Sequence, residues 1–305
     1  MYKRQVILGP VADVSVGDLF VGMLIPGLML AGLYILYILG RCIIRPQDGP
    51  SLPPAENDPP FIRKLWITAT ALVPPLILIF AVLGTIMLGL ATPTEAAAMG
   101  AIGTVVMTLI YGTFNFDIMQ QAFLKTLQIT AMILTILLGG VMFAGVFVAL
   151  GGISAVQNLL ETAQLGPWAT MIILMLIAFI AGFVLDLISI ILIIIPVSVA
   201  VLRAMGVDDV WFCIMFLVVI QTSYLTPPMA PAIFYLRGIS PPEIRLGDMY
   251  RGVLPFIALE FICLGAIMIW PDLALKLPEL LFERVAKGTP SVSYTHLRAH
   301  ETSID

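Results

Sequence analysis

The chain has 305 residues, of which 60% are hydrophobic and 11% are charged. Soluble domains carry about 25% charged residues, so this composition excludes a soluble protein and predicts an all-α integral membrane protein. The formal net charge of −4 is small and indicates no nucleic-acid partner.

Few side chains here can perform catalysis or hold a tightly bound metal. The only histidines, His296 and His300, lie in the C-terminal tail, which argues against a Ser–His protease and against zinc chemistry. The cysteines Cys42, Cys213 and Cys263 are far apart and lie in or beside apolar runs, so we interpret them as packed thiols. We expect no enzyme activity and no cofactor.

The two ends differ in character from the rest of the chain. "MYKRQ" at 1–5 and "SVSYTHLRAHETSID" at 291–305 resemble translated adapter sequence. We therefore expect residues 1–5 to be non-native. The tail spans 286–305, and we expect it to be non-native from about residue 292. The natural protein would then be longer than this chain.

Apolar stretches follow one another along the chain, and about 20 residues are enough for a helix to cross a membrane. Full-length candidates lie at roughly 20–40, 66–90, 95–113, 126–150 and 250–270. Residues 116–124 fit a short interfacial helix. Two further stretches contain interruptions: 168–204 at Gly182 and Asp186, and 210–236 at Thr226-Pro227-Pro228.

Residues 45–65 form a polar, proline-rich linker that we expect to be extended or disordered. Because basic residues flank both of its helices, the positive-inside rule places the linker in the cytoplasm. Counting crossings then places 92–95 and 151–167 outside. The same count places the following basic residues inside: Arg237, Arg245 and Arg251.

A short motif occurs twice, as "GDLFVGMLIPG" at 17–27 and "GDMYRGVLPFI" at 247–257. The predicted topology gives the two copies opposite orientations, which suggests an inverted-topology repeat. Residues 6–44 would then end the first repeat, and residues 66–285 would form the second.

The segment "QTSYLTPPMAP" at 221–231 breaks an apolar helix, although an internal proline costs about 3 kcal/mol or more. Non-helical backbone at membrane depth is tolerated only inside protein or around a water-filled site. Freed carbonyls and the hydroxyls of Thr222, Ser223 and Thr226 would suit sodium. The alternative is a simple kink that neighbouring hydroxyls satisfy.

The segment "GFVLDLISIILIIIP" at 182–196 contains the second interruption. We interpret 168–204 as a re-entrant hairpin with its tip at 182–189, although two short tilted helices that cross the membrane would also fit. Asp186 is a functional-site hypothesis because an ionisable residue inside a membrane is costly. Alternatively, Asp186 caps the second helix of the hairpin.

Several motifs occur together in an order that is similar to one family. "TPTEAAA" at 92–98, "GFVLD" at 182–186 with Pro196 behind it, and "TPP" at 226–228 resemble the large membrane subunit of tripartite ATP-independent periplasmic (TRAP) transporters, the DctM-like permeases. Residues 11–27 resemble the family's segment after its first broken helix. The resemblance covers roughly residues 6–285.

The resemblance implies a secondary transporter in the cytoplasmic (inner) membrane of bacteria or archaea, with two inverted repeats and an elevator mechanism. Such transporters import organic acids, often C4-dicarboxylates or sialic acid, with sodium as the coupling ion. A periplasmic substrate-binding protein delivers the ligand, and a small four-helix subunit braces the permease in the lipid bilayer.

The resemblance also assigns site residues, at the hairpin tip and the second broken helix. The sodium site would comprise Gly182, Asp186, Ser189, Thr222, Thr226 and Pro227, and the substrate site would include Ser223, Thr226 and Pro228. The chain departs from the family where a glycine usually follows the double proline, because Met229 or Ala230 stands there.

Three other functions fit parts of the sequence. A divalent-anion/sodium symporter would share the inverted repeat and work without a binding protein. An intramembrane aspartyl protease needs two facing carboxylates. Asp186 is the only aspartate deep in an apolar run, and no spacing argument pairs it with Glu260. A purely structural subunit would leave both breaks unexplained.

Overall fold

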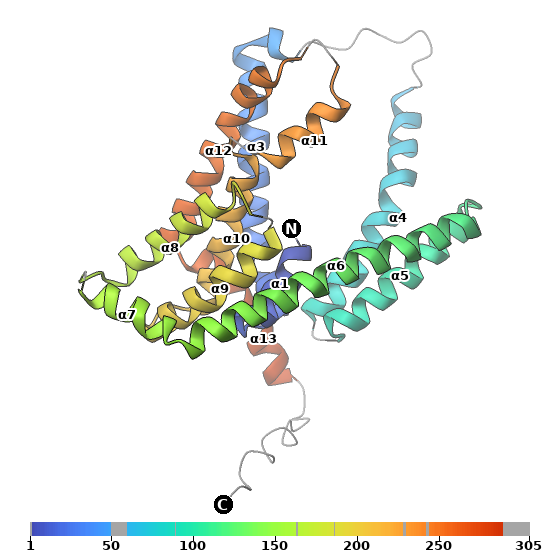
Figure 1. Ribbon diagram of the computed structural model, residues 1–305. Coiled ribbons are helices and arrows are strands. Elements are labelled where there is room, and N and C mark those ends of the chain that lie inside the picture. The colour runs from blue at the N-terminus through green and yellow to red at the C-terminus, as the bar shows by residue number, and fades with distance from the viewer. Residues whose placement is uncertain are drawn as a thin grey trace, which may run out of the picture.

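Figure 1 shows the computed structural model, which describes residues 2–49, 60–88, 90–162, 164–185, 187–227, 230–241 and 244–288. These residues form helices and the turns between them, with no strand within the described ranges. Six helices or helix pairs are long and apolar enough to cross a membrane. The prediction of an all-α integral membrane protein is confirmed at this level.

The helices follow the predicted apolar stretches closely. In chain order they are α1 (Tyr2–Ala12), α2 (Val16–Gly22), α3 (Leu24–Ile44), the 3-10 turn η1 (Pro46–Asp48), α4 (Phe61–Met87), α5 (Pro93–Ile110), α6 (Phe116–Ala149), α7 (Gly152–Thr162), α8 (Pro167–Ala181), α9 (Leu187–Ala204), α10 (Asp209–Leu225), α11 (Pro231–Ile239), α12 (Leu246–Ile269) and α13 (Asp272–Gly288).

Side-chain caps decide where α5 and α6 begin. Thr92 and Glu95 form a capping box at the start of α5, with Thr92 N donating to Glu95 Oε2 at 2.8 Å. At α6, Asn115 Oδ1 accepts a bond from Asp117 N at 2.9 Å. Because this cap starts the helix at Phe116, the prediction of a separate interfacial helix at 116–124 is wrong. That segment is the first part of one 34-residue helix.

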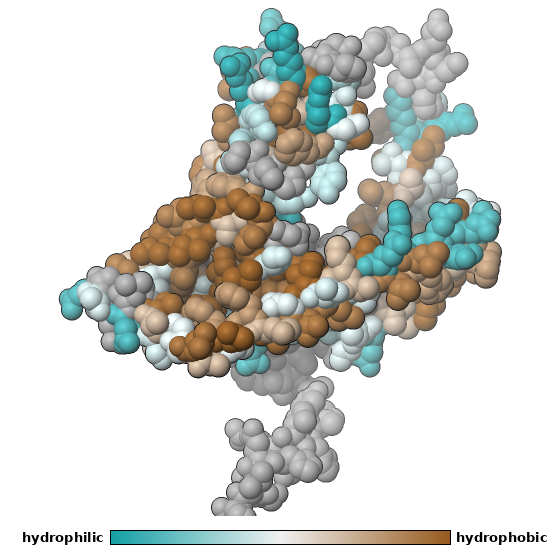
Figure 2. Space-filling model, in the orientation of Figure 1, coloured by the Kyte–Doolittle hydropathy of each residue, from teal (hydrophilic) through white to brown (hydrophobic). Residues whose placement is uncertain are grey.

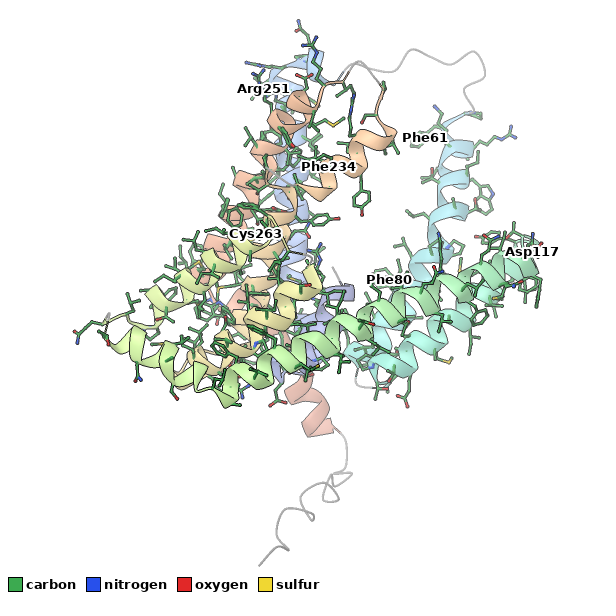
Figure 3. The ribbon with its side chains drawn as sticks, viewed as in Figure 1. Phe61, Phe80, Asp117, Phe234, Arg251 and Cys263 are labelled. Carbon is green, nitrogen blue, oxygen red and sulfur yellow. The ribbon has the colours of Figure 1, made fainter. Side chains whose placement is uncertain are left out.

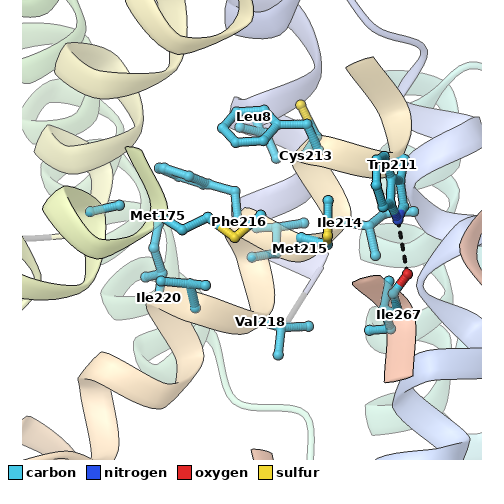
Figure 4. Packing of buried hydrophobic residues seen from close by; sticks show 14 of the residues in the cluster. Leu8, Met175, Trp211, Cys213, Ile214, Met215, Phe216, Val218, Ile220 and Ile267 are labelled. Atoms are coloured by element: carbon cyan, nitrogen blue, oxygen red, sulfur yellow. Dashed lines mark hydrogen bonds between the residues drawn. The ribbon is translucent and has the colours of Figure 1, made fainter. Parts of the chain in front are cut away.

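Helix α10 lies at the centre of the fold and packs against α1, α2, α8, α9, α11, α12 and α13. Every side chain from Trp211 to Ile220 is buried. A helix that is apolar all round must be surrounded by protein, and α10 meets that condition. Figure 4 shows Phe216 and its neighbours on α10 packing against Leu8 of α1 and Met175 of α8.

Helices α4 and α5 pair with each other at one side of this core, and α6 packs along α9 (Figure 1). Their outward side chains are apolar and exposed, as at Phe80 (71% exposed) and Leu138 (63%). Figure 2 shows apolar residues across the visible body, with hydrophilic residues gathered near helix ends. Such a surface suits contact with lipid or another membrane subunit.

The two copies of the Gly-Asp motif precede long helices that run in opposite directions: the first copy spans α2 and the start of α3, and the second starts α12. Helices α3 and α12 lie side by side and antiparallel (Figure 1), and Tyr34 and Tyr37 of α3 both meet the Phe256 ring edge-on. The start of α12, marked by Arg251, lies at the same end of the molecule as the start of α4, marked by Phe61 (Figure 3). This arrangement agrees with the predicted placement of the linker and the C-terminal arginines on one side of the membrane.

We expect Trp211→Phe to lower the stability of the fold. The buried Trp211 Nε1 donates to the carbonyl of Ile267 at 3.0 Å and so ties α10 to α12. Loss of this bond leaves a buried carbonyl unpaired, at a cost of about 1–3 kcal/mol. The midpoint of thermal unfolding in detergent micelles would report the change. Trp66→Phe is the matched control because Trp66 is 69% exposed, and equal shifts in the two variants would contradict the prediction.

Candidate functional site

The two interruptions that the sequence marks lie against each other. Helix α8 ends at Ala181 and α9 begins at Leu187, while α10 ends at Leu225. The hydroxyl of Ser223 donates to the carbonyl of Phe179, in the last turn of α8, at 3.0 Å. A Cβ atom added to Gly182 would lie 2.1 Å from Ser223 Oγ. Only glycine therefore allows the end of α8 to approach α10 this closely.

Hydroxyl groups satisfy the backbone of α10 where the helix ends. The Thr226 amide donates to the carbonyls of Thr222 and Ser223, both at 3.1 Å, and Thr226 Oγ1 donates to Thr222 O at 2.7 Å. Thr222 Oγ1 donates to Val218 O at 2.9 Å. Because each hydroxyl hydrogen is used within the helix, the oxygen lone pairs remain available to accept a bond or to hold a cation.

The chain leaves the break through a residue with unusual backbone geometry. Ala230 has φ of 27° and ψ of 66° and is fully buried, immediately before α11 starts at Pro231. Positive φ strains any residue with a Cβ atom, whereas glycine tolerates it. The glycine that the resemblance leads one to expect near this position therefore has a physical reason, and this chain carries the strain instead.

A cavity of about 150 Å³ lies between the end of α8, the start of α9 and the end of α10. Its lining includes Gly182, Leu187, Ile220, Tyr224 and Tyr235. It therefore combines two tyrosines with apolar walls, at the place where the helix ends of the two interrupted segments meet. This volume is below the roughly 300 Å³ at which pockets for drug-sized ligands begin, so it suits a small ligand or an ion.

The structure brings together some of the predicted site residues and not all of them. Gly182, Thr222, Ser223 and Thr226 cluster at the junction of α8 and α10, and the half-buried Pro227 follows them. Ser189, at the end of the predicted tip, lies within the first turn of α9, and its part in the site stays a prediction. Asp186 and Pro228 fall outside the described residues, so their roles stay predictions.

Sequence reasoning missed a buried carboxylate beside the break. Glu260 of α12 is 0% exposed, and Tyr34 of α3 donates a hydrogen bond to its Oε1 at 3.0 Å. The only sequence signal is a glutamate in the middle of an apolar helix, which by itself indicates no partner. Its partner Tyr34 is 226 positions away in the chain, which no local pattern reveals.

Residues 4 and 5 also contact the core. Arg4 Nη1 donates to Gln221 Oε1 at 2.7 Å, and the guanidinium lies 5.4 Å from the centre of the Tyr224 ring. Gln5 donates to the carbonyl of Leu19 at 3.1 Å. These contacts do not test the expected foreign origin of residues 1–5, which stays a prediction.

Comparison with known protein families shows which family the chain belongs to. Residues 4–273 match the family described as "Tripartite ATP-independent periplasmic transporter, DctM component". The chain belongs to this DctM family. The resemblance inferred from "TPTEAAA", "GFVLD" and "TPP" is thereby confirmed.

Named DctM relatives come from several bacteria. The chain is 28% identical to the sialic acid TRAP transporter large permease protein of Vibrio cholerae, over 90% of this chain and 62% of that protein. It is 29% identical to the C4-dicarboxylate TRAP transporter large permease protein of Rhodobacter capsulatus, over 72% and 50% respectively. It is 25% identical to the 2,3-diketo-L-gulonate TRAP transporter large permease protein of Escherichia coli, over 70% of this chain and 50% of that protein.

The chain thus spans between half and about three fifths of these DctM relatives. All three are named as transporter permeases, which confirms the expectation that the chain is not an enzyme. Together with the apolar helices, the DctM match makes the chain part of a multi-pass membrane protein.

We expect Gly182→Ala to destabilise the junction by about 1–3 kcal/mol, because the new methyl group overlaps Ser223. In a Ser223→Gly background the clash is removed, so the same substitution should cost less than half as much. Thermal unfolding of the four chains of this double-mutant cycle in detergent micelles provides the measurement. Gly139→Ala is the control, since nothing lies within 4 Å of its added Cβ atom. Equal costs in the two backgrounds would contradict the contact.

Ala230→Gly should stabilise the protein by on the order of 1 kcal/mol, because it removes the strain of a Cβ atom at positive φ. Ala178→Gly is the matched control: it is equally buried but lies inside α8, where glycine costs about 1 kcal/mol. The two substitutions should therefore move the thermal midpoint in opposite directions. A fall in both midpoints would argue against the strained geometry at Ala230.

Proposed function

We propose that the chain forms part of the large permease subunit of a sodium-coupled secondary transporter, which imports a carboxylate substrate. The observation that carries the proposal is the contact of the α8 end with the broken end of α10, through Gly182 and Ser223. Helix interruptions at membrane depth are tolerated only where protein buries them or where they line a water-filled site, and here a cavity of about 150 Å³ lies beside them.

The fold supports an inverted repeat. The first Gly-Asp motif spans α2 and the start of α3, the second starts α12, and α3 and α12 pack together antiparallel. The interrupted helices pack around α10, whereas α4 and α5 form a separate pair beside this core. In the elevator mechanism that we propose, the core that carries the site would move against such peripheral helices.

The oxygen atoms at the break support sodium as the coupling ion. Thr222 and Thr226 present neutral hydroxyl oxygens whose hydrogens are already donated into the helix. Hard cations bind oxygen ligands. Sodium is singly charged and so does not need several carboxylates around it. The described residues contain no cluster of three His, Cys, Asp or Glu side chains that could hold a metal ion.

The proposed substrate is a small organic acid. The named relatives transport sialic acid, 2,3-diketo-L-gulonate or C4-dicarboxylates, all of which carry a carboxylate. The start of α9 at Leu187 lines the cavity, and helix N-termini favour anions. Ser223, Thr226 and Pro228 would form one wall of the substrate site.

The proposal includes the partners of a tripartite system: a periplasmic substrate-binding protein, a small four-helix membrane subunit and the lipid of the bacterial or archaeal inner membrane. A divalent-anion/sodium symporter without a binding protein is the alternative. Uptake that requires a binding protein encoded beside the permease gene would separate the two, because the symporter would need none.

We expect Thr226→Ala, and likewise Asp186→Asn, to raise the sodium concentration that gives half-maximal uptake by several-fold. Thr226→Ala removes a predicted oxygen ligand, and Asp186→Asn removes a predicted negative charge. The measurement is uptake of the binding protein's radiolabelled ligand into proteoliposomes that contain the complete permease and its membrane partner. Thr135→Ala is the matched control, since Thr135 makes the same bond to a carbonyl four residues earlier, in α6. An unchanged sodium dependence in both site variants would exclude these residues from the sodium site.

A further inference from the structure

Glu260 is a carboxyl group buried in the interior of the fold, where removal from water disfavours its charged form. It lies in the middle of α12, with the buried residues Ile257, Cys263 and Leu264 on the same helix. The side chain is 0% exposed. Transfer of an ionised carboxylate out of water is very costly unless the charge is paired, and such residues inside membrane segments usually serve a function.

The contacts of this carboxyl group are incomplete. Tyr34 Oη donates to Oε1 at 3.0 Å, but Oε2 is buried and has no hydrogen-bond partner among the described residues. A single phenol donates one hydrogen bond and carries no charge, so it cannot neutralise a carboxylate. Oε2 is therefore a buried ligand atom without a partner among the described residues, and a bound cation would stabilise the ionised form of the carboxyl group.

Glu260 lies beside the broken helix. The hydroxyl of Thr222 lies within interaction range of the carboxyl group. The carbonyl of Thr222 accepts hydrogen bonds from both the amide and the hydroxyl of Thr226, where α10 ends. The next residue on α12, Phe261, packs against Phe179, whose carbonyl accepts the bond from Ser223. Helix α12 is thus a third wall of the junction between α8 and α10.

We propose that Glu260 supplies the negative charge of a monovalent-cation site at the break of α10, with Glu260 Oε2 and Thr222 Oγ1 as two of its ligands. This inference rests on the proposed function, because it adds a charged ligand to the proposed sodium site. Neutral hydroxyls and carbonyls hold an alkali cation weakly, and a carboxylate in a low-dielectric interior strengthens that attraction greatly. One carboxylate matches one positive charge, which favours sodium over a divalent ion.

Arg4 offers a different explanation for the buried charge, because its guanidinium also lies within electrostatic range of Glu260. Arg4 donates a hydrogen bond to Gln221, however, and its guanidinium lies over the ring of Tyr224, both on α10. Arg4 also belongs to the segment expected to be foreign. If Arg4 alone neutralised Glu260, an Arg4→Gln variant would lose stability at every sodium concentration, and Glu260→Gln would leave sodium binding unchanged.

The test measures sodium binding without any transport substrate. The purified permease in detergent micelles is heated while NaCl replaces choline chloride at constant ionic strength, and a parallel series uses KCl. For Glu260→Gln we expect the sodium concentration that gives half-maximal stabilisation to rise on the order of tenfold. Thr222→Val, which removes the hydroxyl ligand and keeps the carboxylate, should shift it in the same direction and serves if Glu260→Gln does not fold.

Two matched controls separate a cation site from general packing. Thr170→Val in α8 and Ser198→Ala in α9 each remove a hydroxyl that is as buried as Glu260 and that, like Glu260 Oε2, has no hydrogen-bond partner in the described part of the chain. Both should leave unchanged the sodium concentration that gives half-maximal stabilisation, called the sodium midpoint below. Tyr34→Phe keeps the charge, so it should lower overall stability more than it changes the sodium midpoint.

The outcomes distinguish this inference from the proposed function. If sodium stabilises the unmodified permease no more than choline or potassium does, the proposed sodium coupling fails. If sodium stabilises it specifically but Glu260→Gln keeps the sodium midpoint within about twofold, only the role of Glu260 is overturned. A shift for Glu260→Gln and Thr222→Val, but not for the controls, supports the site.

Discussion

Hydrocarbon offers no hydrogen bonds, and this constraint governs how α10 can end. A helix that stops at membrane depth must have its last polar groups satisfied by protein. At Thr226 the side chain turns back to the helix, and at Ser223 it bonds to the neighbouring α8. The approach of Gly182 makes the second bond possible, because any larger residue would hold the two helices apart. The junction therefore depends on the absence of a side chain at Gly182 as well as on the hydroxyl of Ser223.

The central position of α10 follows from the same constraint. Its ten consecutive buried residues, from Trp211 to Ile220, fix the helix on all sides before the chain reaches the break. The polar side chains of Thr222 and Ser223 follow in the final turns, and Glu260 of α12 lies beside Thr222. An apolar body of this kind holds the few polar atoms in place, so that a bound ion would meet oxygens already positioned for it.

The sequence predicts the parts of this fold that depend on local chemistry. Apolar length locates the membrane helices, the double proline locates the end of α10, and Thr92 with Glu95 predicts the start of α5. The contacts between distant segments have no such signal. No local pattern links Tyr34 with Glu260. The run of isoleucines in α9 likewise gives no boundary that would locate the start of this helix at Leu187. At Ala230 the family pattern indicates a glycine, but the physical reason is the positive φ of this residue, which the sequence does not reveal.

Similar local sequence does not guarantee similar surroundings, as the two Gly-Asp motifs show. Gly22, in the first copy, is pressed between α10 and α13, where an added Cβ atom would lie 2.5 Å from Ile214 and 2.7 Å from the carbonyl of Ala274. Its counterpart Gly252 has nothing within 4 Å of an added Cβ atom. Tight packing therefore requires glycine in the first copy and does not explain it in the second. The packing of each copy therefore depends on what the rest of the chain brings to it, and not on the shared sequence alone.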